Sequence, residues 1–392
     1  MHLFINSLAA SAGGGLTYIR NVIPRLAVEP GVEVTVAVSG NLQQEFSSFP
    51  NVRFLNLQMS APRRFLLEQS ELPKLIRQHR CDVLLSAGNF AIRKSPVPQI
   101  LLSRNSVYTS DDFYRDLLER REYRTWLDTR IRGVLAKKSI QWSDATVAPS
   151  EAFAEDLRRW TGKPICAIHH GFDRDAFTQD GSPLSPDVET KVRGGEVALT
   201  LLFVSHYNYY RNFETLLRAL PILQKKLLKR PLRLLLTCRL VEGTNPGAYH
   251  PERAARLVET LGIRDVVIEL GSVPYQSLHH LYRRADIYVT PAYTETFAHP
   301  LVEAMSSGLP VVASDIPVHR EICGQAANYF PRFSPDALAE RVIEVANSTE
   351  ISTTLAREGE RRSQEFSWKK HVEAILRLAN SLITSNSPRS KH

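Results

Sequence analysis

The chain has 392 residues, of which 43% are hydrophobic and 23% charged, and its formal net charge is +8. This length suits two globular domains, and the sequence has no run of 18 apolar residues that would predict a transmembrane helix. The four cysteines are scattered without a C-x-x-C pair, which argues against a zinc site or a disulfide framework. The N-terminus enters an apolar run at once and lacks the features of a signal peptide, so we expect a cytoplasmic protein.

Short apolar runs alternate with helical patterns along the chain. The expected strands are 3–6, 34–38, 83–86, 99–103, 145–148, 165–168, 200–204, 232–237, 266–270, 287–290 and 311–313. This alternation predicts an α/β fold of two Rossmann-like domains, each with a parallel sheet covered by helices on both faces. A stretch rich in turn-forming residues begins at Gln179 and marks the expected linker. We therefore assign 1–180 to a first domain, 190–366 to a second domain and 367–384 to a C-terminal helix.

Three consecutive glycines, Gly13, Gly14 and Gly15, follow the first strand and precede a helix. Glycine lets the backbone approach a phosphate or a sugar closely, although the same residues suit an ordinary tight turn. Tyr18 stands where the last glycine of a dinucleotide-binding fingerprint would be, so the loop predicts no dinucleotide site. Spacing alone leaves the turn and the ligand loop as equal alternatives.

The segment 113–138 has a helical pattern in which arginines are interleaved with apolar residues. Such a helix suits an anionic membrane surface, and a solvated helix packed on its own domain is the equal alternative. The motifs that accompany nucleic acid binding are missing, so we expect no nucleic acid partner. The adjacent His169 and His170 would point to opposite faces of an extended chain, so we expect no metal site there.

The segment 287–308 carries the clearest functional signal. A buried strand is followed by a loop and then by a helix that is predicted to begin at Pro300 and to end before Gly308. Glu295 then lies on the loop, and Glu303 lies one turn into the helix. The backbone N–H groups between them form a site for anions at the helix N-terminus. On spacing alone a solvated face is the commoner arrangement, but two carboxylates around an anion site also suit a nucleotide-sugar, whose hydroxyls flank a diphosphate.

This segment resembles the E-x7-E signature of retaining glycosyltransferases of family 4, and the resemblance extends over residues 267–330. It implies the GT-B fold, with two Rossmann-like domains that face each other across a cleft and a C-terminal helix that crosses back to the first domain. The first domain would bind the acceptor and the second the donor. The sequence departs from the family at Ala298, where members usually have glycine, and the added methyl group would lie near the transferred sugar.

The resemblance also implies roles for the residues of the second domain. Glu303 would hold the nucleotide ribose, and Glu295 would hydrogen-bond the transferred sugar. The diphosphate would be held by the backbone N–H groups from Phe297 to Leu301 and by Arg211. The remaining donor-binding candidates are Ala298 and His299 within that stretch, Gly271 and Val273 beside the base, and Gly14 and Gly15 in the glycine loop of the first domain.

The sequence also departs from the family in the phosphate-binding loop that carries Arg211 and at Arg104, near the expected acceptor. Arg211 matches the family's phosphate-binding lysine, but the usual arginine earlier in that loop is missing, and His206 either takes its place or serves in capping or packing. Arg104, followed by Asn105, stands where many members have a histidine. Because arginine keeps its proton in proteins, Arg104 is not a general base, but it could bind an anionic acceptor or the leaving diphosphate. The catalytic candidates are therefore Glu295, Arg211, Arg104 and Asn105.

We expect an enzyme that transfers a sugar, with retention at the anomeric carbon, from a nucleotide-diphosphate sugar to an acceptor hydroxyl. By resemblance the reaction needs no metal ion or other cofactor, and the acceptor would be a sugar or a lipid-linked molecule in cell-envelope polysaccharide or glycolipid synthesis. The protein would work in the cytoplasm, at the inner face of the membrane if the segment 113–138 binds an anionic surface. A nucleotide-sugar epimerase of the same fold and a non-catalytic nucleotide-sugar-binding protein remain as alternatives.

Overall fold

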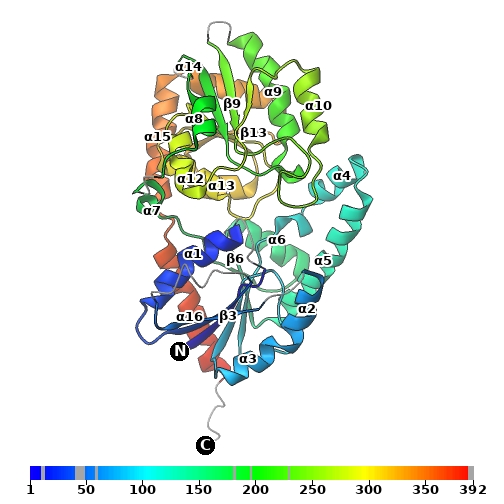
Figure 1. Cartoon of the computed structure of the whole chain (residues 1–392), viewed down its shortest axis with the longest axis vertical. Coiled ribbons are helices and arrows are strands. Elements are labelled where there is room, and N and C mark those ends of the chain that lie inside the picture. The colour runs from blue at the N-terminus through cyan, green and yellow to red at the C-terminus, as the bar shows by residue number, and fades with distance from the viewer. Residues whose placement is uncertain are drawn as a thin grey trace, which may run out of the picture. The chain divides into compact units, whose positions relative to one another are not determined.

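The computed structural model describes residues 1–9, 14–39, 49–57, 61–179, 182–194, 197–227 and 230–386. The chain divides into two compact units (Figure 1). Unit 1 comprises Met1–Thr109, Leu127–Gly171 and Ser367–His392, and unit 2 comprises Ser110–Trp126 and Phe172–Phe366. These ranges differ from the expected division into 1–180 and 190–366, because the chain passes between the units at Gly171 and because a segment from the first half of the sequence belongs to unit 2.

Unit 1 is built on a seven-stranded parallel sheet. Its strands lie in the order β3-β2-β1-β4-β5-β6-β7. Their bounds are β1 His2–Asn6, β2 Glu33–Val38, β3 Val52–Asn56, β4 Val83–Ser86, β5 Gln99–Leu102, β6 Ala145–Ala148 and β7 Cys166–Ala167. The order reverses between β1 and β4, so the loops after these two strands diverge at the carboxyl edge of the sheet, where α/β proteins bind ligands.

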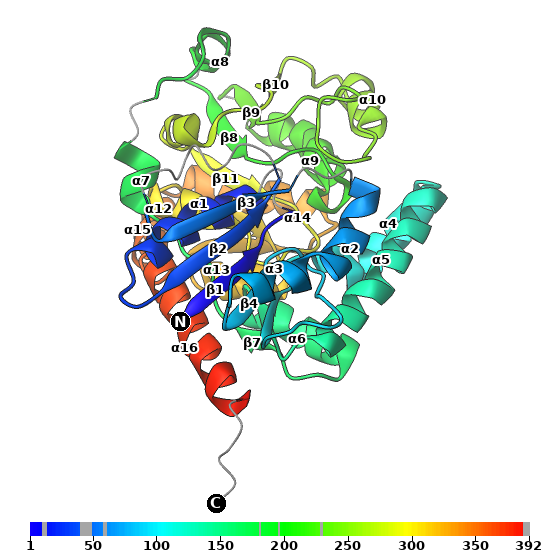
Figure 2. The same ribbon diagram turned by 60° about the horizontal axis from the view of Figure 1, so that its bottom comes forward.

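Helices cover both faces of this sheet (Figure 2). They are α1 Gly14–Ala27, α2 Ala61–Ser70, α3 Leu72–Gln78, the 3-10 helix η2 Ser106–Tyr108, α6 Glu151–Thr161, α16 Trp368–Asn386 and most of α5 Tyr123–Trp142. One face packs on α1 and α16, through Leu3 and Ile5 of β1. The other face packs on α3, through Phe4. The alternation of side chains along a strand sends neighbouring residues of β1 into these two cores.

Unit 2 has a six-stranded parallel sheet in the order β10-β9-β8-β11-β12-β13. Its strands are β8 Leu199–Phe203, β9 Leu232–Leu236, β10 Val267–Glu269, β11 Ile287–Thr290, β12 Val311–Ser314 and β13 Ala327–Phe330. The order reverses between β8 and β11, which pair directly through Ile287 and Leu201. Each unit is therefore a doubly wound Rossmann-like domain, as the sequence predicted.

The helices of unit 2 surround its sheet. They are α4 Asp111–Glu119, α7 Arg174–Gln179, α8 Pro186–Val192, η3 Tyr209–Arg211, α9 Phe213–Lys226, α10 Glu252–Thr260, η4 Tyr275–Ser277, α11 Leu278–Tyr282, α12 His299–Ser306, α13 Pro317–Cys323, α14 Pro335–Asn347 and α15 Thr349–Ser363. On the sheet, α9 packs against α10 and α14, and α12 packs against α13 and α15. The segment 113–138, expected as one helix, is split between α4 and α5, and Arg121 between them has a positive φ of 62°.

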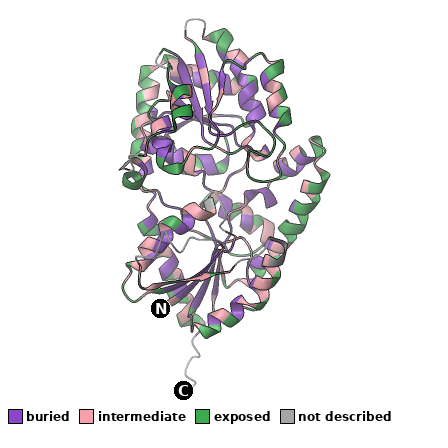
Figure 3. Cartoon of the chain, in the orientation of Figure 1, coloured by how far each residue is buried: buried purple, intermediate pink, exposed green. Residues whose placement is uncertain are grey.

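The strands form the buried core of each unit, whereas the helices are buried on one side and exposed on the other (Figure 3). Every residue of β4, β5, β8, β11 and β12 is buried, and these apolar runs were all expected from the sequence. The two strands that the sequence analysis missed, β3 and β13, lie at the edges of their sheets and have partly exposed residues. Polar residues, Arg53 in β3 and Asn328 in β13, interrupt their apolar runs.

The C-terminal helix α16 belongs to unit 1 and completes its core. The aromatic rings of Tyr18, His170, Trp368 and His371 pack together at its start. Nδ1 of His371 lies 2.8 Å from the carbonyl oxygen of His169, so this nitrogen donates, and Nε2 accepts from the Tyr18 hydroxyl at 3.0 Å. Burial, together with the charge of Arg104, lowers the pKa of His371 to about 4, which keeps the ring neutral.

Candidate donor site in unit 2

Two loops of unit 2 leave the carboxyl ends of the strands at which the sheet order reverses. The loop after β8 carries His206 and leads into η3, which ends at Arg211, and the loop after β11 carries Glu295. Because β8 and β11 are hydrogen-bonded neighbours, their carboxyl ends meet at one edge of the sheet. The topology therefore brings together residues that are 84 positions apart, at the place where this architecture binds ligands.

Hydrogen bonds connect the loop after β8 to the loop after β11. The backbone N–H of Tyr293 donates to the carbonyl oxygen of Tyr210 at 3.0 Å, and Nδ2 of Asn212 donates to the carbonyl oxygen of Pro291 at the same distance. Asn212 has a φ of 55°, a left-handed conformation that asparagine tolerates better than most residues. The backbone that carries Arg211 is thus tied to the backbone that leads to Glu295.

Arg211 and Glu295 form an ion pair, and their side chains are 19% and 7% exposed. Two sheltered opposite charges stabilise each other, whereas either one alone would be costly to bury. The guanidinium also lies over the Tyr210 ring, with Cζ 5.4 Å from the ring centroid. The cation expected to hold the diphosphate is therefore paired with the carboxylate expected to hold the sugar.

Glu303 lies on α12 and is buried, with 4% of its surface exposed. Its Oε2 accepts a hydrogen bond of 2.7 Å from the hydroxyl of Tyr282 on α11. Burial raises the pKa of Glu303 from its ordinary 4.5 to about 7, and the Tyr282 hydrogen bond opposes this only in part. The solvated face that was the alternative for Glu303 is therefore wrong, because surface carboxylates are not enclosed in this way.

The loop between the glutamates enters α12 through Ala298, whose φ of 64° lies in the left-handed region. Glycine adopts this conformation without the steric cost that a Cβ brings, so the backbone itself gives a reason why glycine is the usual residue here. The N–H of Leu301 already donates to the carbonyl oxygen of Ala298 at 3.0 Å, and Pro300 has no N–H. The expected set of anion-binding N–H groups from Phe297 to Leu301 is therefore smaller than the sequence suggested.

The remaining candidates of unit 2 flank these loops. Gly271 follows β10 with a φ of 79°, and a Cβ built there would lie 3.2 Å from Nε of Arg239. Arg239 follows β9 at the same edge of the sheet, and the sequence analysis missed it. Val273 is half-buried and precedes η4. His206 is exposed, and partial burial of its ring together with the charge of Arg211 lowers its pKa.

His319 on α13 is a second residue that the sequence analysis missed. It is fully buried, and its Nδ1 lies 2.9 Å from the carbonyl oxygen of Ser314 at the end of β12. Burial lowers its pKa to about 4, and the charge of Arg211 acts in the same direction, so the ring is neutral at pH 7. Within the described part of the chain, Nε2 of His319 has no hydrogen-bond partner.

The segment 110–126 joins unit 2 through an ion-pair network. Arg120, just after α4, contacts Asp116 at 2.7 Å and Glu214 on α9 at 2.8 Å. Asp116 in turn accepts from the hydroxyl of Tyr293 at 2.9 Å, two residues before Glu295. Glu122 accepts from the hydroxyl of Tyr209 at 2.8 Å, two residues before Arg211. This segment therefore braces both loops of the candidate site.

The candidate residues of unit 1 lie in or beside its helices and strands, and Arg104 and Asn105 contact other residues of that unit. Helix α1 begins at Gly14, so Gly14 and Gly15 lie in its first turn, while Gly13 lies outside the described residues. Arg104 follows β5, donates from Nη2 to the carbonyl oxygen of Ala87 at 2.5 Å and lies over the Tyr18 ring. Asn105 caps η2, where its side chain accepts from the N–H of Val107 at 3.3 Å.

The histidine pair of unit 1 lies beside the start of α16. His170 packs among the rings described above, and the carbonyl oxygen of His169 accepts from His371. Across the described ranges, no three His, Cys, Asp or Glu side chains are grouped as metal ligands would be. In the same ranges, no helix is both long and apolar enough to span a bilayer.

Comparisons with known proteins agree with this architecture. The structure matches sucrose-phosphate synthase from Thermosynechococcus elongatus with a TM-score of 0.74 and 18% identity, over 98% of this chain and 100% of the other. It matches Anabaena HepE in complex with UDP-glucose with a TM-score of 0.72 and 15% identity, over 97% and 100%. At such low identities these neighbours establish the fold, which is GT-B as the resemblance implied.

Sequence comparison is more specific. A D-inositol 3-phosphate glycosyltransferase from Saccharomonospora viridis is 29% identical over 258 residues, which are 64% of this chain and 58% of that protein. The chain thus matches little more than half the length of this relative. The family model for glycosyl transferases group 1 matches residues 192–362, and the model for Glycosyltransferase Family 4 matches residues 12–176. Two glycosyltransferase family models therefore match successive parts of the chain, Glycosyltransferase Family 4 first and glycosyl transferases group 1 second.

Proposed function

We propose that this protein transfers a sugar from a nucleotide-diphosphate sugar to an acceptor hydroxyl, with retention at the anomeric carbon. The observation that supports this most directly is the Arg211–Glu295 ion pair at the edge of the unit 2 sheet, with the buried Glu303 eight residues further along the chain. One cation and two carboxylates suit a ligand that carries a diphosphate between two groups of hydroxyls. The two family domains are consistent with such a donor.

Each group then has a task in the reaction. The donor diphosphate takes over the guanidinium of Arg211, which releases the carboxylate of Glu295 for the hydroxyls of the sugar. Glu303, in its ionised form, accepts hydrogen bonds from the ribose. As the bond from the anomeric carbon to the phosphate oxygen breaks, negative charge grows on the diphosphate, and Arg211 with the N-terminal end of α12 stabilises it. In this mechanism, Arg211 and the helix dipole do the work that a metal ion does elsewhere.

The direct test is a transfer assay with UDP-glucose as the first donor, because a structural neighbour was solved with it. Release of UDP that requires an added acceptor would support transfer, and the anomeric coupling constant of the product reports retention. An epimer formed from the donor alone would instead identify an epimerase. Binding of donors without turnover on any sugar or lipid-linked acceptor would identify a non-catalytic binder. A thermal-shift screen with UDP, GDP and ADP should precede the assay, since a ligand at 100 times its Kd stabilises by about 2.7 kcal/mol.

We further propose that the protein works on the cytoplasmic face of a membrane, on an acceptor of the cell envelope. Helix α5 exposes three apolar side chains at spacings of four and three, Leu127, Ile131 and Val134, which are 55%, 61% and 59% exposed. This spacing places them on one face of the helix, and we call them the α5 stripe. The exposed Arg124 and Lys138 lie near the same face. An apolar face flanked by basic residues suits an anionic lipid surface better than water.

Cosedimentation with anionic vesicles tests this. Each basic residue near such a surface contributes about 1 kcal/mol, and salt screens the attraction. Arg120, which the sequence alone would include among the residues to change, is unsuitable because it neutralises Glu214 inside unit 2. Arg121, Arg124 and Lys138 are exposed, and replacing all three with glutamate should abolish binding at low salt.

A matched control carries the same change of charge elsewhere, at the exposed Lys94, Lys369 and Lys370. This control should still bind vesicles. If both triple variants lose binding equally, general charge rather than α5 is responsible. If the wild-type protein ignores anionic vesicles at low salt, a membrane-independent acceptor becomes the better proposal.

A further inference from the structure

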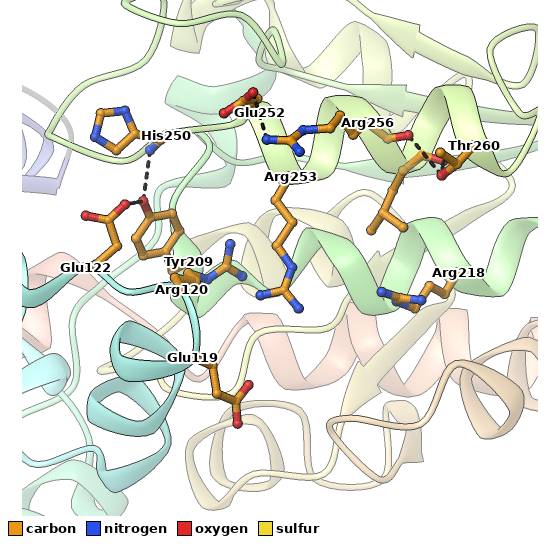
Figure 4. A pocket seen from close by; sticks show the side chains of 11 residues that line it. Glu119, Arg120, Glu122, Tyr209, Arg218, His250, Glu252, Arg253, Arg256 and Thr260 are labelled. Atoms are coloured by element: carbon orange, nitrogen blue, oxygen red, sulfur yellow. Dashed lines mark hydrogen bonds and ion pairs between the residues drawn. The ribbon is translucent and has the colours of Figure 1, made fainter.

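Unit 2 contains a cavity of about 530 Å³ that is separate from the residues assigned to the donor (Figure 4). It lies between α9, α10, the end of α4 and η3. Its lining residues are Glu119, Arg120, Glu122, Tyr209, Arg218, His250, Glu252, Arg253, Arg256, Leu257 and Thr260. A volume of this size is in the range that accommodates a small organic ligand.

The arginines that line the cavity differ in whether a carboxylate neutralises them. Arg120 is held by Asp116 and Glu214, and Arg256 is held by Glu252 at 2.7 Å. Arg218 and Arg253 differ, because among the described residues neither has an ion pair or a hydrogen bond from its side chain. Figure 4 shows Arg253 extending from α10 toward α9, on which Arg218 lies. Within the described residues, two exposed guanidinium groups without a carboxylate partner therefore line one cavity.

The rest of the lining offers hydrogen-bond acceptors and a fixed wall, in which Arg120 covers the buried ring of Tyr209. Glu119 and Glu122 come from the end of α4 and the turn that follows it. The Tyr209 hydroxyl donates to Glu122 and accepts from the N–H of His250 at 3.1 Å, so its ring is held in place. The wall is thus pre-organised, whereas the two arginines are free to adjust to a ligand.

We propose that this cavity binds a phosphate-bearing small molecule, with its phosphate between Arg218 and Arg253. The planar fork of a guanidinium donates two parallel hydrogen bonds to phosphate oxygens, and two such forks on neighbouring helices can grip one phosphate from both sides. The organic part of the ligand would turn its hydroxyls toward Glu119 and Glu122. This site does not depend on the proposed transfer reaction.

Inorganic phosphate is the probe. Because phosphate could also bind at the proposed donor site, every protein compared carries a substitution that removes the phosphate-binding cation of that site. Binding is therefore measured by calorimetry in the Arg211→Ala variant and in the same variant that also carries Arg218→Ala and Arg253→Ala. We expect the additional changes to weaken phosphate binding by at least about tenfold, the effect of losing one charge-assisted hydrogen bond. Lys225→Ala in the Arg211→Ala background is the matched control, since Lys225 is exposed on α9 but outside the cavity, and it should change nothing.

A second measurement uses the unaltered protein. Phosphate should slow the modification of Arg218 and Arg253 by phenylglyoxal, mapped by mass spectrometry, while the exposed Arg77 of unit 1 reacts at the same rate with and without phosphate. Equal affinity in the variants with and without Arg218 and Arg253 would overturn the proposal. So would the absence of phosphate binding in the Arg211→Ala variant, or protection of Arg77 to the same degree as the cavity arginines.

Discussion

The buried carboxyl group of Glu303 links ligand binding to stability, and Glu303→Gln tests both at once. The pKa of this group is about 7 in the folded protein and 4.5 ordinarily. The folded state therefore binds a proton more tightly than the unfolded state, and ionisation of Glu303 progressively destabilises the fold as pH rises from 4.5 to 7. Above pH 7 the full cost, about 3 kcal/mol, is present.

Glutamine has the same shape but does not ionise, so the variant escapes this cost. Between about pH 5 and pH 8 the stability of the variant relative to wild type should rise by about 2.5 kcal/mol. For a unit of this size that corresponds to about 5–10 °C in Tm. Any cost of burying the amide N–H groups of glutamine is the same at every pH. It therefore does not change the rise in relative stability between pH 5 and pH 8. Thermal unfolding of both proteins across this pH range therefore isolates the ionisation of Glu303.

Nucleotide binding should change in the opposite direction. If the carboxylate accepts hydrogen bonds from the ribose, its loss should weaken binding by about 1.5–3 kcal/mol. Because only the ionised form is competent, binding of a nucleoside to the wild type should tighten by about tenfold from pH 6 to pH 8. The variant should show no such trend, and the use of a nucleoside avoids titration of the ligand's phosphates. Equal pH profiles for the two proteins, in stability and in binding, would refute the reasoning.

Three further changes test other parts of the argument. Arg211→Ala should weaken binding of a nucleoside diphosphate far more than that of the nucleoside, and equal losses in calorimetry would mean that Arg211 acts only through structure. Ala298→Gly should relieve a left-handed backbone conformation and raise stability by up to about 1 kcal/mol, seen as a higher Tm; a lower Tm would contradict this. Gly171→Ala would place a Cβ 1.9 Å from the backbone nitrogen of Trp368, so it should destabilise unit 1 by about 1–3 kcal/mol, and an unchanged denaturation midpoint would show that the contact yields easily.

The central strands could be predicted from the sequence because they are buried on both faces and so are mostly apolar. Three of them, β4, β6 and β11, were predicted with the bounds that they have in the structure, 83–86, 145–148 and 287–290. The edge strands β3 and β13 were missed because Arg53 and Asn328 interrupt them, whereas the edge strands β7 and β10 lie in apolar runs that the sequence did predict. The alternation of strands and helices was sufficient to predict two Rossmann-like units, since only parallel sheets accommodate it.

Local sequence also placed Glu295 on a loop and Glu303 on a helix, because proline and glycine mark helix ends through their backbone geometry. Only the tertiary structure decided what these carboxylates contact. The partner of Glu295 is Arg211, 84 residues away in the chain, and the partner of Glu303 is Tyr282 on another helix. Burial by those neighbours raises the pKa of Glu303, and no local pattern encodes burial of this kind.

The same distinction explains the segment 110–126. Its arginines and apolar residues predict a helix but not the unit to which the helix belongs. That is decided by Arg120, whose charge is neutralised by Glu214 of unit 2, and by Asp116, which accepts from Tyr293. A charged side chain is stable in a sheltered position only where opposite charges meet it. Helical pattern is a property of neighbouring residues, whereas this pairing depends on residues about one hundred positions or more away, which only the folded chain brings together.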